Sequence, residues 1–281
     1  MNNAPDLPAV CLDQFGVIYV TGADTRTFLQ GQLSLDTGRL TPQRLELASC
    51  NSPQGRVQAV LWIVERSDGL AMLLPASMLD ATVARLRKYI LRAKVKIDPA
   101  GERLVAYDAG VGDLLARTHA EVDGVSLIGW PGAPQRRLML APLVPGATHD
   151  PAQREAWHLA DIRAGLPQVY PQTHEAFVAQ MLNLDQLDGI HFDKGCYTGQ
   201  EIIARTHYRG AIKRRMFRFA AACPPPEPAT RVSVAGTHAG DVVDAAATTD
   251  GCELLAVVNI AQADAALELE GIADNGLRRL G

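Results

Sequence analysis

The sequence predicts an α+β protein that ends in a small antiparallel β-sheet or β-barrel. Helical and β-rich patterns alternate through most of the chain. The prolines of Cys223–Pro228 then interrupt this pattern and form a stiff connector, because proline cannot donate to a sheet ladder. Only short strand-like runs separated by turn residues follow. We therefore expect two parts, 1–222 and 223–281, with the first divided into two α+β lobes at about 1–100 and 101–215.

The first lobe begins with a strand and a helix, in which Phe28, Leu29 and Leu33 share one face. An antiparallel meander follows, because turn sequences separate three β-rich runs. A second amphipathic helix and a returning strand complete the lobe. The predicted elements are strand 17–22, helix 23–33, strands 44–50, 56–65 and 70–75, helix 76–91 and strand 93–99.

The second lobe has a looser pattern, with Gly and Pro at every junction. Its clearest element is a helix that Asp150 caps, Pro151 opens and Gly165 ends, with Pro167 beyond the stop. Before it we expect strand 103–108, a short helix around 114–117 and strands near 125–128 and 137–143. Beyond the connector, strand-like runs occupy 230–236, 239–249, 253–260 and 266–271.

Composition excludes several classes of protein. Five widely spaced cysteines without a CxxC pair argue against a disulfide framework or a self-contained zinc or cluster site, and favour a reducing cytoplasm. No apolar run reaches the roughly 20 residues that a membrane span needs, and we expect no export signal. A net charge of −4 does not attract nucleic acid globally, although Arg205–Arg218 carries six Arg or Lys residues.

One stretch, KGCYTGQE at 194–201, carries the chemistry. Thr198 and Glu201 have the spacing of a capping box, which predicts a helix start that places Cys196 just before a helix N-terminus. That position, with Lys194 nearby, favours the thiolate over the thiol. Gly195 and Gly199 let the backbone turn closely on both sides. The alternative is an inert, buried cysteine beside an ordinary helix cap.

Other side chains have suitable chemistry without a supporting pattern. His191 and His207 lack partners at metal-ligand spacing, so we interpret them as packing or surface histidines. No phosphate-binding glycine loop and no GxSxG nucleophile motif occurs. The remaining candidates, as acid or base or as stacking rings, are Glu175, Asp185, Asp188, Phe15, Trp157 and Tyr197.

These motifs resemble those of the YgfZ family of folate-binding proteins, relatives of the T-protein of the glycine cleavage system. The similarity covers about Leu12 to Arg215. The matching stretches are VTGADTRTFLQGQLSLD at 20–36, ADIRAGLP at 160–167, EAFVAQMLNLDQLDGIHF at 175–192, and KGCYTGQE at 194–201 followed by IARTHYRG.

The resemblance implies a three-lobed T-protein-like body around a central channel, with a C-terminal antiparallel β-barrel. It also implies tetrahydrofolate in that channel, with Trp157 and Phe15 as aromatic contacts and Glu175 near the pterin. In the motif it implies a reactive centre of Cys196, Lys194 and Tyr197, surrounded by Gly195, Gly199, Gln200, Glu201 and Arg205.

The function implied is support for the assembly, maintenance or repair of iron-sulfur enzymes, including tRNA-modifying ones. A cluster needs about four ligands, so Cys196 could hold one only as a ligand shared with an iron-sulfur client or carrier protein, and the chain has no intrinsic metal site. The basic run 205–218 could bind tRNA or the folate glutamate tail, but we expect a solvated strand face.

Two positions depart from the related patterns. The family usually has proline where Ala179 stands, which loosens a turn. T-proteins have an aspartate near Gln58, and an amide cannot supply that carboxylate charge, so aminomethyltransferase chemistry is not expected. Two alternatives stay open: a folate-dependent one-carbon transferase or demethylase, and a folate-binding scaffold without chemistry.

Overall fold

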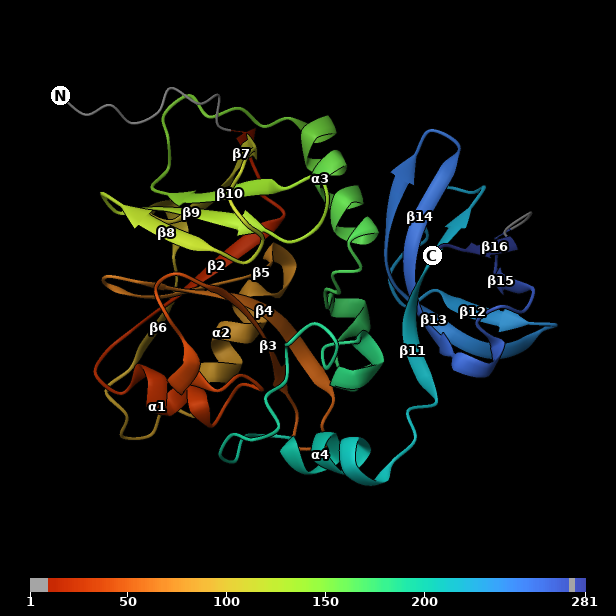
Figure 1. The fold of residues 1–281 in the computed structure, drawn as a ribbon, viewed down its shortest axis with the longest axis horizontal. Coiled ribbons are helices and arrows are strands. Elements are labelled where there is room, and N and C mark those ends of the chain that lie inside the picture. Colours follow the sequence, from red (N-terminus) through yellow and green to blue (C-terminus); the bar gives the residue numbers. More distant parts are fainter. Residues whose placement is uncertain (1–9, 273–275) are drawn as a thin grey trace. The chain divides into compact units, whose positions relative to one another are not determined.

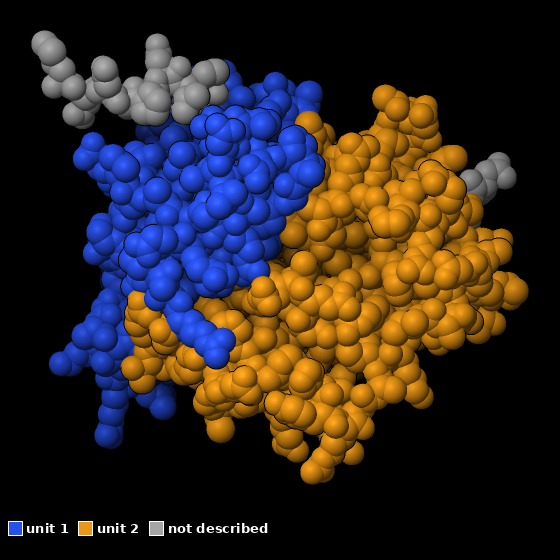
Figure 2. All heavy atoms as spheres, in the orientation of Figure 1, with its two compact units in different colours: residues 1–25, 39–46, 62–154 blue, residues 26–38, 47–61, 155–281 orange. Residues whose placement is uncertain are grey.

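A computed structural model describes residues 10–272 and 276–281, and Figure 1 shows its elements in chain order. Figure 2 colours its two compact units. The first comprises 39–46, 62–154 and the described part of 1–25, and the second comprises 26–38, 47–61 and the described part of 155–281. Each unit is built from three separate stretches of the chain, so neither unit is a continuous segment of the sequence.

The first unit contains a complete five-stranded antiparallel sheet in the order β1-β7-β10-β9-β8. Tyr107, Trp130 and Leu138 are fully buried in it. Its strands are β1 (Val10–Cys11), β7 (Val105–Val111), β8 (His119–Val122), β9 (Val125–Trp130) and β10 (Arg136–Ala141). The expected strands at 103–108, 125–128 and 137–143 are therefore confirmed within a few residues.

The predicted helix at 114–117 is wrong. Arg117 has a left-handed φ of 63°, and its backbone N–H donates to Gly129 O at 2.7 Å. A Cβ on Gly129 would lie 1.9 Å from Leu115 O, so the chain packs directly against the glycine of β9. The sequence here contains good helix formers, but this long-range pairing with β9 prevails over their local propensity.

The second five-stranded sheet has the order β3-β4-β5-β2-β6. It confirms the predicted meander, because β4 pairs antiparallel with β5 through Trp62–Leu73 and its neighbours, and β2 pairs with β5. The strands are β2 (Phe15–Thr21), β3 (Leu45–Asn51), β4 (Val57–Arg66), β5 (Gly69–Pro75) and β6 (Lys96–Pro99). Near-continuous burial of β4 matches its apolar sequence, whereas β3 buries the polar Glu46, Ser49 and Asn51 as well.

A closed antiparallel barrel forms the C-terminal region, in the order β11-β14-β13-β12-β15-β16. Phe219, Val232, Val242, Leu254 and Leu267 are among the buried residues of its core. The strands are β11 (Arg214–Ala221), β12 (Arg231–Val234), β13 (Thr237–Thr248), β14 (Gly251–Asn259), β15 (Leu267–Leu269) and β16 (Gly276–Arg279). The predicted C-terminal β-barrel is thus confirmed.

The barrel begins earlier than the proline-rich connector. Strand β11 precedes Cys223–Pro228 and pairs with β14 and β16, so the connector joins two strands of the barrel. Proline suits a loop between strands, because it has no backbone N–H and the residues of a loop do not need one for strand pairing. The division of the chain at 222 and 223 itself stays a prediction.

Four α-helices are described: α1 (Thr25–Gln30), α2 (Leu79–Arg87), α3 (Pro151–Arg163) and α4 (Gln200–Arg209). Asp150 caps α3 as expected, because its Oδ1 accepts from Ala152 N at 2.9 Å. The basic run is not one strand face, since α4 ends at Arg209 and β11 begins at Arg214. None of the described helices is long and apolar enough to cross a membrane.

Candidate functional site

Lys194 anchors the loop that carries Cys196. Its side chain is buried, and its Nζ donates to the backbone oxygens of Gln30, Leu33 and Leu35 at 2.7, 2.6 and 2.6 Å. Burial lowers the pKa of Lys194 to about 8, opposed by the Asp36 carboxylate. The side chain is therefore still an ammonium at pH 7, and each of its three N–H groups donates a hydrogen bond to one of the three carbonyls.

Tyr197 anchors the other side of the thiol. The Lys194 ammonium lies 4.7 Å from the centroid of its buried ring, within cation–π range. Burial also raises the pKa of Tyr197, which keeps the phenol neutral. The next residue continues the attachment, because Thr198 N donates to Gly31 O at 3.2 Å. Lys194 before the Gly195–Cys196 segment and Thr198 after it are thus both hydrogen-bonded to residues 30–35.

His191 joins the same two stretches of chain. Its backbone N–H donates to Ser34 O, and its Nδ1 accepts from Asp36 N, both at 3.0 Å. The buried Ser34 hydroxyl donates to Gly189 O at 2.5 Å and accepts from Ser49 N at 2.8 Å. Sequence patterns singled out 20–36 and 175–201 separately, and the structure places 30–36 against 189–198.

The predicted capping box at Thr198 and Glu201 is wrong. Helix α4 starts at Gln200, its N-cap is Gly199 with φ 83°, and no side chain caps it. A Cβ on Gly199 would lie 2.5 Å from Ser52 O in the β3–β4 turn. Position 199 therefore requires glycine, because the backbone passes too close to this turn for a side chain. Thr198 donates to Gly31 O and does not cap the helix. Cys196 lies four residues before the first residue of α4.

Gly199→Ala tests this close approach. We expect the variant to lose about 1–2 kcal/mol of unfolding free energy, because alanine is strained at positive φ and its Cβ meets a backbone oxygen. Chemical denaturation measures the loss. Gly195→Ala is the matched control, since a Cβ there meets nothing within 4 Å. Equal stabilities for the two variants would contradict the packing described.

Cys196 is the exposed member of the five cysteines, and Cys11, Cys50, Cys223 and Cys252 are buried. Free cysteines are ordinarily buried small apolar residues, so an exposed one on an anchored loop has no packing role to explain it. The alternative of a buried cysteine at this position is therefore wrong.

The remaining shell residues of the motif divide into two kinds. Gln200 supports the loop, because its Oε1 accepts from Tyr197 N at 3.3 Å. Glu201 and Arg205 are exposed on α4 and do not contact the loop through any described hydrogen bond. Gly55, in the β3–β4 turn, also packs against this helix, because a Cβ there would lie 2.8 Å from Ile202 Cβ.

Glu175 lies on the segment that pairs with the start of β4. It has a left-handed φ of 59°, and its backbone N–H donates to Val57 O at 3.0 Å. Gln58 Nε2 donates to Glu175 Oε1 at 2.7 Å. The amide at position 58 therefore holds the Glu175 carboxylate, and a second carboxylate there would repel it. Glu175 is exposed and retains acceptor capacity for a ligand.

The two predicted aromatic contacts differ from Glu175 in exposure. Trp157, on α3, has 2% of its surface exposed. Phe15, at the start of β2, is half-buried and packs edge-on against Trp130, with ring centroids 5.3 Å apart. Asp185 has a structural partner, because Arg215 binds its carboxylate at 2.8 and 3.0 Å.

Sequence reasoning missed a buried polar cluster between α3 and the barrel. Asp244, 4% exposed on β13, accepts from Tyr170 OH at 2.8 Å, and both of its oxygens lie 3.0 Å from His158 Nε2. Burial works against the His158 imidazolium, but the charges of Asp244, Asp161 and Glu155 outweigh it and raise the pKa of His158 to about 9. An aspartate flanked by the apolar residues of VVDAAA, at 242–247 in β13, was the available signal.

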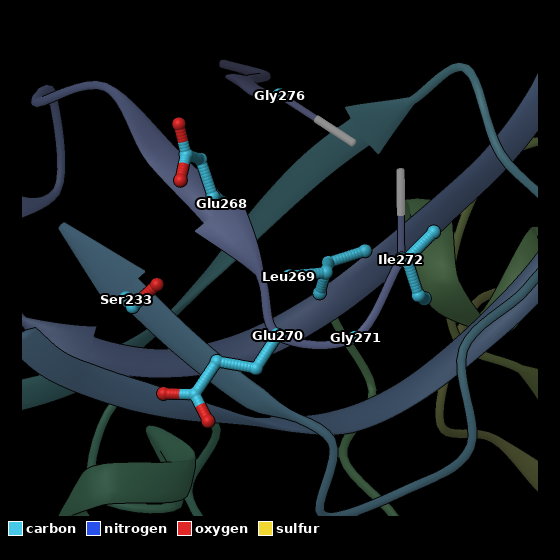
Figure 3. Close-up of a pocket in the computed structure, with 7 residues that line it drawn as sticks. All are labelled: Ser233, Glu268, Leu269, Glu270, Gly271, Ile272 and Gly276. Atoms are coloured by element: carbon cyan, nitrogen blue, oxygen red, sulfur yellow. The ribbon is translucent and has the colours of Figure 1, made fainter. Parts of the chain in front are cut away.

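Two pockets open at the barrel. Figure 3 shows the first, of about 560 Å³, where Ser233, Glu268 and Glu270 display their polar groups. The second, of about 440 Å³, is lined by Arg163, Thr248 and Cys252 among others. None of the sequence-predicted site residues lines either pocket. No group of three or more His, Cys, Asp or Glu in the described chain could hold a metal ion.

A search of solved structures finds a similar fold. The crystal structure of glycine cleavage system aminomethyltransferase T from Bartonella henselae aligns with a TM-score of 0.72, over 97% of this chain and 84% of that chain. The chain has a T-protein-like fold. The two sequences are 13% identical, so the likeness concerns the fold alone. No family model matches the chain, and the similarity to the YgfZ family rests on the quoted motifs.

Proposed function

We propose that this protein binds a reduced folate and uses the Cys196 thiol in the assembly, maintenance or repair of iron-sulfur enzymes. The observation that carries the proposal is the presentation of Cys196: the side chain is exposed, while Lys194 and Tyr197 on either side of it are buried and anchored. The buried contacts of its neighbours hold this loop in place, and the exposed thiol itself does not pack in the core.

The thiol acts with a partner in this proposal. One cysteine supplies one of the roughly four ligands that a cluster takes, and the described chain holds no group of three or more His, Cys, Asp or Glu that could bind a metal ion. The client or carrier protein would supply the remaining ligands. Gly195 fits this role, because a Cβ there would meet nothing within 4 Å, which leaves the space beside this residue open to a macromolecule.

Folate binding is supported by the T-protein-like fold and by the chemistry of Glu175. A carboxylate held by Gln58 at 2.7 Å stays an acceptor, which suits the N–H donors along one edge of a pterin ring. The nearly complete burial of Trp157 leaves it little surface for a ligand, so we assign the polar contact to Glu175 before any aromatic one. Contacts of Trp157 and Phe15 with folate stay predictions.

Gln58 favours an accessory role over direct one-carbon transfer. Its amide occupies the place where the related pattern has an aspartate, and it already donates to Glu175. A transferase would need a second carboxylate to position a carrier, and Gln58 cannot supply one, because its side chain is a neutral amide. Turnover of a methylamine donor with tetrahydrofolate by the purified protein would support the transferase alternative instead.

Titration with tetrahydrofolate tests the proposal. We expect the parent and Cys196→Ser to bind alike, and Glu175→Ala to bind at least about tenfold more weakly, as loss of a charge-assisted hydrogen bond implies. Glu227→Ala, at an exposed position on the connector, is the matched control. In cells lacking the protein, Cys196→Ser should fail to restore iron-sulfur enzyme activity.

The two readouts separate the parts of the proposal. Undiminished binding by Glu175→Ala would remove the assignment of the folate contact. Full rescue by Cys196→Ser would remove the thiol from function and leave the folate-binding scaffold. Absence of any folate binding by the parent would show that folate is not the ligand.

A further inference from the structure

Three aromatic rings gather on the surface between the start of the Cys196 loop and α4. The rings of Phe192 and His207 stack with centroids 3.8 Å apart and planes 16° apart. Tyr208 meets both at near-right angles, with centroid distances of 6.3 Å to Phe192 and 4.7 Å to His207. The cluster joins two segments, so it is an arrangement of the folded chain.

The cluster is open to solvent. Tyr208 is 65% exposed, which is high for a large ring, and His207 is also exposed. Core packing does not account for such exposure, because each ring leaves apolar surface in water. Phe192 and His207 stack on each other, and this stacking leaves Tyr208 beside them largely exposed. One ring face is therefore available for a planar ligand.

Three cationic residues lie on α4 and in the segment that follows it. Arg205 and Arg209 lie one turn apart on α4, and Lys213 follows in the segment before β11. All three are exposed and, within the described residues, none forms an ion pair. Asp193 and Glu201 are the acidic residues of these two segments, and Glu201 lies in the first turn of α4. The C-terminal half of the helix is thus cationic.

We propose that this surface, made by Phe192, His207, Tyr208, Arg205, Arg209 and Lys213, binds single-stranded nucleic acid. Exposed rings beside unpaired Arg and Lys match the two components of such a ligand, since bases stack on rings and phosphates pair with cations. A duplex presents stacked, paired bases and would use the cations alone. An acidic peptide would likewise leave Tyr208 unused.

The arginines also complement the negative end of the helix dipole. That role requires neither the exposed tyrosine nor its contact with Phe192 from another segment. The inference does not depend on folate binding or on thiol chemistry. Cys196→Ser should therefore bind nucleic acid like the parent, which separates this proposal from the proposed function.

Fluorescence anisotropy with labelled 12-nucleotide RNA and DNA of mixed sequence tests the proposal. We expect dissociation constants of about 1–100 µM at 100 mM KCl, typical of non-specific binding. Three cations predict a slope of log K against log salt of about −2, which Arg205→Ala should reduce by about 0.7. Tyr208→Ala should weaken binding about 5- to 150-fold, and Tyr208→Phe should retain it.

Tyr89→Ala is the matched control, because Tyr89 is 43% exposed with Arg85 4.9 Å above its ring. It should bind like the parent. No binding at 50 mM KCl, equal affinity for a duplex of the same sequence, or an unchanged affinity in Tyr208→Ala would each overturn the proposal. Tighter binding of a poly-glutamate peptide than of either oligonucleotide would assign the surface to an acidic protein instead.

Discussion

Lys194→Met is expected to destabilise the protein by about 2–4 kcal/mol and to loosen the Cys196 loop without touching the thiol. Methionine has a similar length but no donor, so three backbone oxygens lose the ammonium that now lies 2.6–2.7 Å from them. The variant also loses the cation above the Tyr197 ring. Urea unfolding measures the first effect.

Hydrogen exchange measures the second. The amide of Thr198 donates to Gly31 O in the parent, and we expect exchange in 192–199 to accelerate in Lys194→Met. Lys213→Met is the control, because Lys213 is exposed, and its stability should stay within about 0.5 kcal/mol of the parent. An unchanged exchange rate would mean that Lys194 does not hold the loop.

If the loop loosens, rescue of iron-sulfur enzymes should fall in parallel, although Cys196 remains present. This outcome would assign Lys194 a positioning role and not a direct part in chemistry. Its three protons are already committed to carbonyls, which leaves none to donate to the thiol. Whether Lys194 also acts on Cys196 through its charge stays a prediction.

The anchoring could not be predicted from the sequence because its contacts are distant. Lys194 and its three carbonyl partners are 159 to 164 residues apart in the chain. Local patterns identified the strands and helices, whose hydrophobic periodicity is a short-range property. They also singled out both contacting stretches, yet nothing in either stretch indicates that they meet.

The two wrong local predictions have a common cause. At 114–117 and at Thr198–Glu201 the sequence favours helix or helix capping, and in both places a backbone approach decides the conformation. Gly129 and Gly199 make these approaches possible, because a Cβ would lie 1.9 and 2.5 Å from a backbone oxygen. Gly199 lies within its motif and was an available signal, whereas Gly129 lies in β9, distant in sequence from 114–117. Helix propensity is too weak to resist such packing.

Asp244→Ala is expected to cost about 3–5 kcal/mol at pH 7, because it removes the acceptor of His158 and Tyr170 from a buried site. Asp241→Ala is the matched control on the same strand. Asp241 also accepts from a histidine, His238, at 3.0 Å, but both side chains are more than a quarter exposed. We expect a loss of at most about 1 kcal/mol there.

The same pair predicts a pH dependence. The pKa of His158 is raised to about 9 in the folded protein, against about 6.5 in an unfolded chain. Its stabilisation is fully present below about pH 6.5 and is lost as the pH rises to about 9. Lys194, with a pKa lowered to about 8, works in the opposite direction above that pH. The window from pH 6.5 to 8 therefore isolates His158.

Across that window the free energy of unfolding contributed by His158 should fall by about 1.6 kcal/mol. The difference between the parent and Asp244→Ala, measured by urea unfolding at each pH, reports this fall because other titrating groups cancel. Asp241→Ala should follow the parent. A difference independent of pH would mean that His158 is not held as an imidazolium, and that Asp244 serves mainly as the acceptor for Tyr170.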